Sequence, residues 1–447
     1  MDNVLANQSA VEEKLDFRRI LPVFIIVLVD LLGLTIIIPL LPLYATSFGA
    51  DAFVIGALGA AYPLLQFFGA PLLGRLSDRF GRKPVLVVSQ IGTLIGFVIL
   101  GMANTLGLLF LSRIIDGISG ANIATAQAVI SDSTTPKTRT QGLGLIGAAF
   151  GLGFIIGPII AFTALAMSDN NYQAPAWIAA GFSLLSILLT IFWLEETLKP
   201  DSRGQSSGRS WVGLGTMFQA LRRPEVGFLL ALMFFQQFAF GGFENLLALF
   251  TLNRLGMNAA SNAILFVFVG IIVVAVQGKL VGQWSRRFGD RWLVVMGLSV
   301  LGLALILSAL TPRQPVPWYS QASLRAELSN GGQFAEVARP TNIKIDLPAD
   351  DNNGWLGLGW LLIVLVPISV AGGVLHPATN SMITKRVEAG DVGGILGMSA
   401  SFYSAANALA PLILGGVFHV LGSTAPFLIG GLILLVLWLV ASKKIEA

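Results

Sequence analysis

The chain has 447 residues, of which 55% are hydrophobic and only 12% are charged. Soluble domains carry about 25% charged residues, so this composition, with its mean hydropathy of +0.78, excludes an ordinary water-soluble globule and indicates an integral membrane protein. The sequence has no cysteine and two distant histidines, His376 and His419. Disulfides, cysteine nucleophiles and a histidine metal-ligand motif are therefore excluded, and we expect no metal and no cofactor.

Twelve apolar segments are long enough to cross a bilayer, since a spanning helix needs about 20 apolar residues. The first six are predicted at residues 20–45, 52–73, 85–104, 107–130, 139–163 and 175–194. The second six are predicted at residues 225–251, 260–281, 292–311, 355–383, 390–416 and 424–441. The sequence therefore predicts an all-α membrane protein with two six-helix halves, 20–194 and 225–441.

Polar segments connect and flank these helices. Residues 195–224 are rich in Ser, Gly and Arg and are predicted to form a flexible linker between the halves. Residues 312–354 form a polar external loop, and residues 1–19 and 442–447 form the tails. Most Lys and Arg residues lie on the side of the tails, and basic loops face the cytoplasm. We therefore expect cytoplasmic termini, and the net charge of +4 reflects topology rather than a nucleic-acid partner.

A charged stretch, Gly74–Leu86, separates the second and third segments. A weaker copy at 282–294 separates the eighth and ninth, with Gly, Ser, Arg, Phe and Gly conserved between the two copies at equivalent positions. Parallel repeats of six helices are a recurrent transporter plan. The internal repeat therefore supports two related halves.

The spacing of this stretch resembles the loop motif that the major facilitator superfamily carries between its second and third helices. Gly74 would allow close helix approach, Gly81 would permit a tight turn, and Asp78 can pair with Arg82. The resemblance covers nearly the whole chain apart from the tails and residues 312–354. It implies a latch that ties the two halves together in one state of a two-state cycle, with the members Gly74, Asp78, Arg79, Gly81, Arg82 and Asp132.

Ionisable residues lie within the predicted spans, where each costs about 2.5–3.5 kcal/mol at a helix centre. Asp30 lies in the first span, and the fourth span is predicted to present Arg113, Asp116, Gly120 and Gln127 on one narrow helical face. We therefore expect Asp30, Arg113 and Asp116 to form a cluster. Two interpretations remain open for this cluster. It is either a permanent structural ion pair or a proton-coupling site, in which Asp30 takes up a proton when desolvated and loses it when Arg113 approaches.

Three segments resemble the drug/proton antiporter group of the superfamily, and tetracycline antiporters in particular. They are the stretch from Asp30, the stretch from Arg113, and the glycine-rich fifth span with Gly153, Gly157 and Pro158. The resemblance implies that the proton is the coupling ion. Glycines at this spacing are also typical of general helix packing.

The match departs from tetracycline antiporters at several positions. Ala161 and Phe162 replace two glycines of the fifth span, while Gly96 and Val273 stand where the group carries an acid and a histidine. Tetracycline is therefore not the expected substrate, although a related efflux role is.

Polar residues at helical spacing are candidates for the walls of a substrate cavity. In the seventh span, Glu244 is the acid within the apolar part of the second half, and we interpret it as a site for a substrate cation or a proton. A hydrated position near the external end is the alternative. The other candidates, which could equally be helix–helix contacts, are Tyr62, Gln66, Gln127, Gln237, His376, Tyr403 and Asn407.

These features favour a proton-coupled exporter of an amphipathic or cationic small molecule that works by alternating access. A lipid or lysolipid mover, or an importer of a sugar or metabolite, is the alternative on the same fold. A membrane enzyme or receptor lacks support, because no nucleophile–base set or phosphate-binding loop is present. We expect a monomer in the cell membrane, in bacteria the inner membrane, with membrane lipids and a small-molecule or lipid-like substrate as partners.

Overall fold

The computed structural model describes residues 17–120, 122–134, 139–198, 214–223, 226–330, 344–386 and 392–445. Within these ranges the chain forms helices joined by loops and contains no strand. Ten of the described helices are long and apolar enough to cross a membrane. The prediction of an all-α, multi-pass membrane protein is confirmed.

The N-terminal half contains helices α1 to α8. In chain order they are α1 (Phe17–Ile37), α2 (Leu41–Ser47), α3 (Ala52–Phe80), α4 (Arg82–Gly101), α5 (Leu106–Ser119), α6 (Asn122–Asp132), α7 (Arg139–Met167) and α8 (Gln173–Trp193). The short helix α9 (Leu214–Leu221) lies within the predicted linker, whose residues 199–213 are outside the described ranges.

The C-terminal half contains helices α10 to α17. In chain order they are α10 (Gly227–Leu255), α11 (Ala259–Ala275), the π-helix η2 (Val276–Leu280), α12 (Val281–Phe288), α13 (Asp290–Ala309), α14 (Gln321–Asn330), α15 (Leu356–Thr384), α16 (Val392–Leu421) and α17 (Ala425–Lys444). Helix α14 lies in the polar loop 312–354, where no element was predicted.

Most predicted spans correspond to one helix, although the ends differ. Helix α3 continues to Phe80 and helix α10 to Leu255, beyond the predicted ends. The last turns contain Arg79 and Arg254. These turns can remain helical there because long basic side chains reach the aqueous edge of a bilayer. Helix α1 begins at Phe17, inside the predicted tail.

Two predicted spans are broken rather than continuous, and a third changes its helix type along its length. The span 20–45 divides into α1 and α2 around Pro39, and Pro42 occupies the first turn of α2, where a missing N–H is tolerated. The span 107–130 divides at Gly120. The span 260–281 continues through the π-helix η2 into α12, so it is longer than predicted.

Close packing requires glycine at the break between α5 and α6. A Cβ atom there would lie 2.5 Å from the Tyr62 hydroxyl oxygen and 2.8 Å from the carbonyl oxygen of Asp116. Only glycine lets α3 approach this point so closely. The expected single helical face from Arg113 to Gln127 is therefore wrong, since Gln127 lies on α6, beyond the break.

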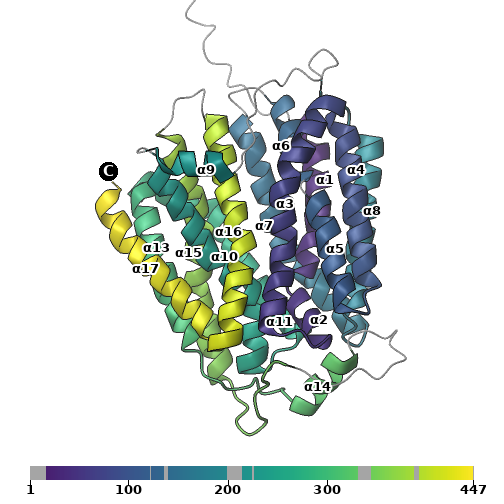
Figure 1. The fold of residues 1–447 in the computed structure, drawn as a ribbon, viewed down its shortest axis with the longest axis vertical. Helices are drawn as coiled ribbons and strands as arrows, with labels where there is room; N and C mark the ends of the chain where they lie inside the picture. Colours follow the sequence, from purple (N-terminus) through teal and green to yellow (C-terminus); the bar gives the residue numbers. More distant parts are fainter. Residues whose placement is uncertain are drawn as a thin grey trace, which may run out of the picture.

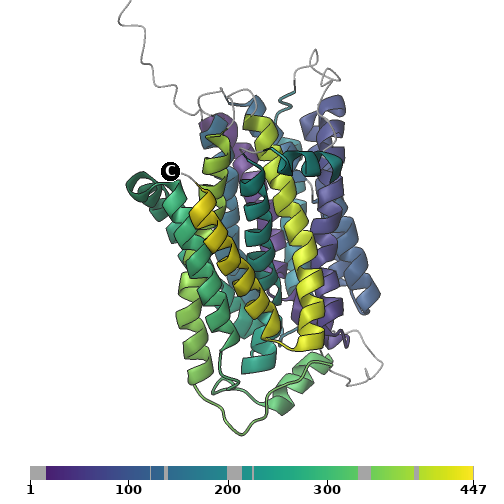
Figure 2. The same ribbon diagram turned by 60° about the vertical axis from the view of Figure 1, so that its left-hand side comes forward.

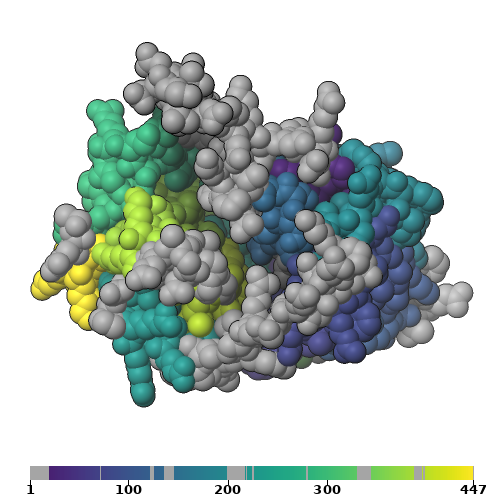
Figure 3. Space-filling view, turned by 90° about the horizontal axis from the view of Figure 1, so that it is seen from above, coloured from purple at the N-terminus to yellow at the C-terminus, as the bar shows by residue number. Residues whose placement is uncertain are grey.

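The helices form two bundles side by side (Figures 1 and 2). Figure 1 shows α9 at one end of the molecule, called here the α9 face, and α2 and α14 at the opposite end, called the α14 face. Seen from the α9 face, the N-terminal half (purple to teal) and the C-terminal half (teal to yellow) lie on opposite sides of the molecule (Figure 3). This arrangement confirms the fold predicted from the internal repeat.

The halves touch mainly on the side of the α14 face. Helix α3 packs on α16 and helix α7 packs on α11. Near the start of α3, a Cβ atom on Gly56 would lie 3.0 Å from the Cα atom of Gly415. Halfway along α7, a Cβ atom on Gly270 of α11 would lie 2.5 Å from the carbonyl oxygen of Phe154. The bundle is therefore closed from the α14 face to about its middle.

Candidate functional site

A cavity of about 1670 Å³ lies between the two halves. Its lining extends from the middle of the bundle to charged residues at the α9 face, including Arg75 and Arg223. Because the halves meet on the other side, the cavity is open toward the α9 face. Most of its central wall is apolar and aromatic, with Phe150, Phe154, Phe240, Phe243 and Phe266.

Every residue predicted to bind substrate lines this cavity. The set comprises Tyr62, Gln66, Gln127, Gln237, Glu244, His376, Tyr403 and Asn407. They come from both halves, on α3, α6, α10, α15 and α16. Helical spacing in the sequence thus identified residues that line one cavity. Spacing alone did not show that the two halves face each other across it.

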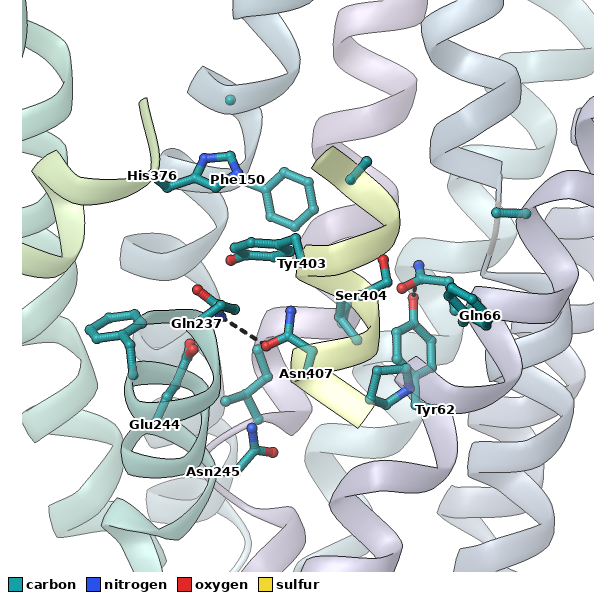
Figure 4. A pocket seen from close by; sticks show the side chains of 18 of the residues that line it. Tyr62, Gln66, Phe150, Gln237, Glu244, Asn245, His376, Tyr403, Ser404 and Asn407 are labelled. Carbon is teal, nitrogen blue, oxygen red and sulfur yellow. Dashed lines mark hydrogen bonds between the residues drawn. The ribbon is translucent and has the colours of Figure 1, made fainter. Parts of the chain in front are cut away.

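The polar residues of the C-terminal half lie near one another in Figure 4. Gln237 Nε2 donates a hydrogen bond to Asn407 Oδ1 at 2.8 Å, which joins α10 to α16. The rings of His376 and Tyr403 lie edge to face with their centroids 4.7 Å apart. His376 Nε2 also lies 3.3 Å from Asn380 Nδ2. These contacts fix the side chains around an open volume rather than filling it.

Glu244 lies about one turn beyond Gly241 and about two turns beyond Gln237 on α10, and it lines the same cavity. In Figure 4 its carboxylate is on the side of Gln237 and Tyr403. The side chain is neither fully buried nor exposed. An acid in a mostly apolar wall that also carries aromatic rings attracts a cation, because the wall provides little competing solvation.

Two further residues of this wall were not predicted. Asn245 follows Glu244 on α10 and donates from Nδ2 to the carbonyl oxygen of Gly241 at 2.8 Å, and Ser404 follows Tyr403 on α16. Both α10 and α16 therefore place two consecutive residues in the cavity wall. Helical periodicity, which singled out every third or fourth residue, could not find them.

On the N-terminal side, Tyr62 and Gln66 of α3 form a fixed pair. Gln66 Nε2 donates to the Tyr62 hydroxyl oxygen at 3.2 Å and to the carbonyl oxygen of Gly120 at 3.0 Å. The pair is thus anchored on the break between α5 and α6. Figure 4 shows it on the opposite side of α16 from Gln237 and Glu244.

The predicted charged cluster lies directly behind Tyr62. Arg113 Nη1 pairs with Asp116 Oδ2 at 3.1 Å, and the two side chains are only 3% and 2% exposed. Asp30, Tyr62 and Asp116 line a second cavity of about 10 Å³, close to the volume of one water molecule. The three predicted charged residues are therefore together, and Tyr62 lines both this small cavity and the large one.

The glycines of the fifth span pack α7 against α1. A Cβ atom on Gly157 would lie 2.7 Å from Thr35 Cβ, and one on Gly153 would lie 3.3 Å from Thr35 Cγ2. Pro158 follows within the same helix. The close approach of the helices accounts for glycine at both positions by packing alone.

The motif at the α9 face forms a compact network. Arg82 Nε donates to Asp132 Oδ2 at 2.9 Å, and Arg82 also pairs with Asp78. Gly81 has a φ of +111°, as the expected tight turn requires. Glu196, which was not predicted, accepts from the Arg82 backbone N–H at 3.0 Å.

Two details of this motif differ from expectation. No atom lies within 4 Å of a Cβ built on Gly74, so this glycine makes no close helix contact in the present state, in which the α9 face is open. Arg79 is exposed, with its guanidinium over the Phe80 ring at 5.3 Å. The Arg82 pairs described above stay within the N-terminal half, so a tie between the halves stays a prediction for a state with the α9 face closed.

Comparison with known proteins places this architecture in a family. The Major Facilitator Superfamily model matches residues 23–330. The tetracycline resistance protein, class B, of Escherichia coli is 26% identical over 398 residues, which cover 88% of this chain and 87% of that protein. Multidrug resistance protein 1 of Bacillus subtilis is 26% identical over 390 residues, which cover 87% of each chain.

A solved structure shares the fold. The human organic anion transporter MFSD10 matches with a TM-score of 0.66 and 24% identity, covering 95% of this chain and 99% of that chain. The expected relationship to tetracycline and multidrug resistance proteins is confirmed, and these relatives are not enzymes. The chain belongs to the major facilitator superfamily and is a multi-pass membrane transporter.

Proposed function

We propose that this transporter exports an amphipathic organic cation in exchange for protons. The observation that carries the proposal is Glu244, a carboxylate in the wall of a large, mostly apolar cavity that also carries aromatic rings. Such a wall accommodates the apolar body of a solute, and a carboxylate near its centre selects a positive charge. The relatives named for tetracycline and multidrug resistance support efflux of a drug-like compound.

The orientation follows from charge. Arg75, Arg79, Arg82 and Arg223 lie at the α9 face, and basic residues concentrate on the cytoplasmic side of membrane proteins. We therefore assign the α9 face to the cytoplasm. The present state is then open to the cytoplasm and ready to receive an exported compound.

Proton coupling is assigned to the buried cluster. Asp30 and Asp116 face one small cavity, and Arg113 pairs with Asp116. A proton on one carboxyl group would weaken its attraction to Arg113 and free the arginine to move, since an ion pair in an apolar interior depends on both charges. The structural role of the Arg113–Asp116 pair is the competing explanation, and the experiment below separates the two.

Tyr62 is the proposed link between this cluster and the substrate. It lines both cavities, so a solute that displaces its ring would alter the surroundings of Asp30 and Asp116. Binding of solute and release of a proton would then be coupled through one side chain.

The test uses purified protein and tetraphenylphosphonium as a probe cation. Binding and the accompanying proton release are measured for the wild type and for Glu244→Gln, Asp30→Asn and Asp116→Asn. We expect Glu244→Gln to weaken cation binding about tenfold or more, and the two Asp variants to retain binding but lose proton release. Glu195→Gln, at an exposed acid, is the matched control.

Two results would reject the proposal. If Glu244→Gln binds the cation as well as Glu195→Gln does, the cationic substrate is wrong. If lysolipid binds while the cation does not, the alternative of a lipid or lysolipid mover replaces the cation exporter. Unchanged proton release in both Asp variants would leave the Arg113–Asp116 pair with a structural role.

A further inference from the structure

The loop between α13 and α15 forms a cap on the α14 face, defined here as the described residues of 312–354. The Val316 backbone N–H donates to the carbonyl oxygen of Leu255, the last residue of α10, at 3.0 Å. Asn253 Nδ2 donates to the carbonyl oxygen of Asp346 at 2.8 Å. The cap is thus bonded to the end of α10 and belongs mechanically to the C-terminal half.

The structure of the cap is consolidated from within. The Tyr319 hydroxyl donates a hydrogen bond to the carbonyl oxygen of Pro348 at 2.7 Å. The backbone carbonyl oxygen of Tyr319 accepts a hydrogen bond from Asn353 Nδ2 at 2.9 Å. The Tyr319 ring lies against Gly256, whose φ of +63° ends α10. The two arms of the loop therefore form one unit that holds α14 in place.

Glu327 of α14 reaches both halves of the transporter with one carboxylate. The hydroxyl group of Tyr172, which precedes α8 in the N-terminal half, donates to Glu327 Oε1 at 3.1 Å. Asn258, which caps α11 in the C-terminal half, donates from Nδ2 to Glu327 Oε2 at 3.0 Å. Each oxygen of Glu327 is thus held by a different half.

Apolar contacts reinforce this bridge. Leu324 and Leu328 of α14 are 4% and 0% exposed, and they belong to the same continuous core as Tyr44 and Tyr172 of the N-terminal half. Helix α14 also packs against α2, as its position beside α2 in Figure 1 illustrates. The cap therefore covers part of the N-terminal half while it is bonded to the C-terminal half.

We propose that α14 is a clasp that holds the α14 face closed through the Tyr172–Glu327 contact. When the halves separate on this side, the cap moves with the C-terminal half, so the Tyr172–Glu327 bond must break while the Asn258–Glu327 bond persists. The clasp stabilises the state open to the α9 face and must be released in every transport cycle. This inference concerns the conformational cycle and does not depend on which solute or ion is carried.

The first test exploits the absence of cysteine from the chain. The pair Tyr172→Cys/Glu327→Cys joins the two halves, whereas Asn258→Cys/Glu327→Cys joins two positions within the C-terminal half. Each pair is bridged by a short, reducible bifunctional methanethiosulfonate reagent in liposomes. Counterflow or pH-driven movement of tetraphenylphosphonium is the transport readout, with the same variants before bridging as references.

We expect the bridge between the halves to stop transport and reduction to restore it. The bridge within the C-terminal half should leave transport at its unbridged level. Transport that continues through the Tyr172–Glu327 bridge, or that stops equally in both pairs, would overturn the clasp.

The second test needs no substrate. Spin labels on Asn104→Cys and Asp351→Cys, both exposed at the α14 face of opposite halves, report the separation of the halves by electron–electron resonance. Tyr172→Phe removes the donor to Glu327 and should raise the ratio of open to closed α14 face about tenfold, as loss of a hydrogen bond to a charged group predicts.

Tyr44→Phe is the matched control for this variant. The Tyr44 hydroxyl donates to the carbonyl oxygen of Ala103 at 2.7 Å, a bond within the N-terminal half that opening need not break. We expect Tyr44→Phe to leave the distance distribution unchanged. Equal distributions for Tyr172→Phe and wild type would contradict the clasp, whatever the protein transports.

Discussion

Asp290 occupies in the C-terminal half the place that Arg82 occupies in the N-terminal half, with the charge inverted. Both residues follow the repeated glycine, Gly81 or Gly289, that begins the next helix. Arg82 pairs with Asp132 at 2.9 Å, and Asp290 pairs with Lys385 at 2.6 Å. Each half therefore ties its loop to the end of another of its own helices through an ion pair of opposite polarity.

This relationship predicts unequal contributions from the two members of the C-terminal pair. Asp290 accepts from Lys385 Nζ at 2.6 Å, Ser285 Oγ at 2.5 Å and Ser381 Oγ at 2.6 Å. Its side chain is 5% exposed, whereas that of Lys385 is 68% exposed. Asp290→Ala should lower the free energy of unfolding by about 2–4 kcal/mol, because three donors lose their acceptor.

Lys385→Ala should cost about 0–1 kcal/mol, since a solvent-exposed partner of an ion pair contributes little. The measurement is thermal unfolding of the two purified variants in the same detergent. A similar loss of stability in both would show that the ion pair, rather than the buried acceptor, dominates this contact.

A second prediction concerns Gly157 and its contact with Thr35. Gly157→Val should separate α7 from α1, because even a Cβ atom there would lie 2.8 Å from the Thr35 backbone carbon. Overpacking of this kind costs about 1–3 kcal/mol. Gly147→Val lies on the same helix, where no atom is within 4 Å of an added Cβ, and it should be tolerated. The measurements are the thermal stability and the transport activity of the two variants. Equal stability and equal transport in Gly157→Val and Gly147→Val would contradict the packing argument.

A third prediction concerns Tyr62 as the link between the two cavities. Tyr62→Phe keeps the ring but removes the acceptor of the Gln66 hydrogen bond. We expect cation affinity to change by about fivefold at most, while the number of protons released per bound cation falls. Isothermal titration in buffers of different ionisation enthalpy gives both quantities. A fall in affinity with unchanged proton release would make Tyr62 a substrate contact only.

Much of the architecture follows from the sequence because a bilayer limits what a spanning segment can be. Long apolar runs predicted the helices, and the repeated loop predicted two halves. The need for glycine at position 120 was not predictable, since it depends on the approach of Tyr62 from another helix. The Asp290–Lys385 pair joins residues far apart in the chain, and local patterns do not encode such contacts.

In the candidate site, too, contacts within one helix could be predicted from the sequence, whereas contacts between helices could not. Spacing of i and i+4 found Tyr62/Gln66, whose hydrogen bond is present, because that relationship lies within one helix. The Gln237–Asn407 bond joins two helices, and only the packing of the half shows it. Glu327 was missed entirely, since it lies in a loop whose composition carries no periodic signal and acquires its partners only when α14 reaches the other half.

The last prediction concerns pH at the α14 face. Burial raises the pKa of Glu327 above its ordinary value of 4.5, although hydrogen bonds from Asn258 and Tyr172 oppose the shift. Tyr172 is the titratable contact of Glu327, and burial together with the Glu327 charge raises its pKa as well. It therefore stays protonated and remains a donor at neutral pH.

When the clasp opens, Glu327 enters water and its pKa returns toward 4.5. The closed state thus binds the proton more tightly than the open one, and acidification must shift the equilibrium toward closure. The pH dependence of closure is confined to the pH range between 4.5 and the raised pKa of Glu327, and it fades above that range.

Spin-label distances at the α14 face measured from pH 8 to pH 5 should therefore move toward the closed population in the wild type. Glu327→Gln cannot take up this proton. The part of the pH-dependent change in distance that is lost in this variant is therefore due to Glu327 and the clasp. An identical pH response in this variant would assign the shift to other groups.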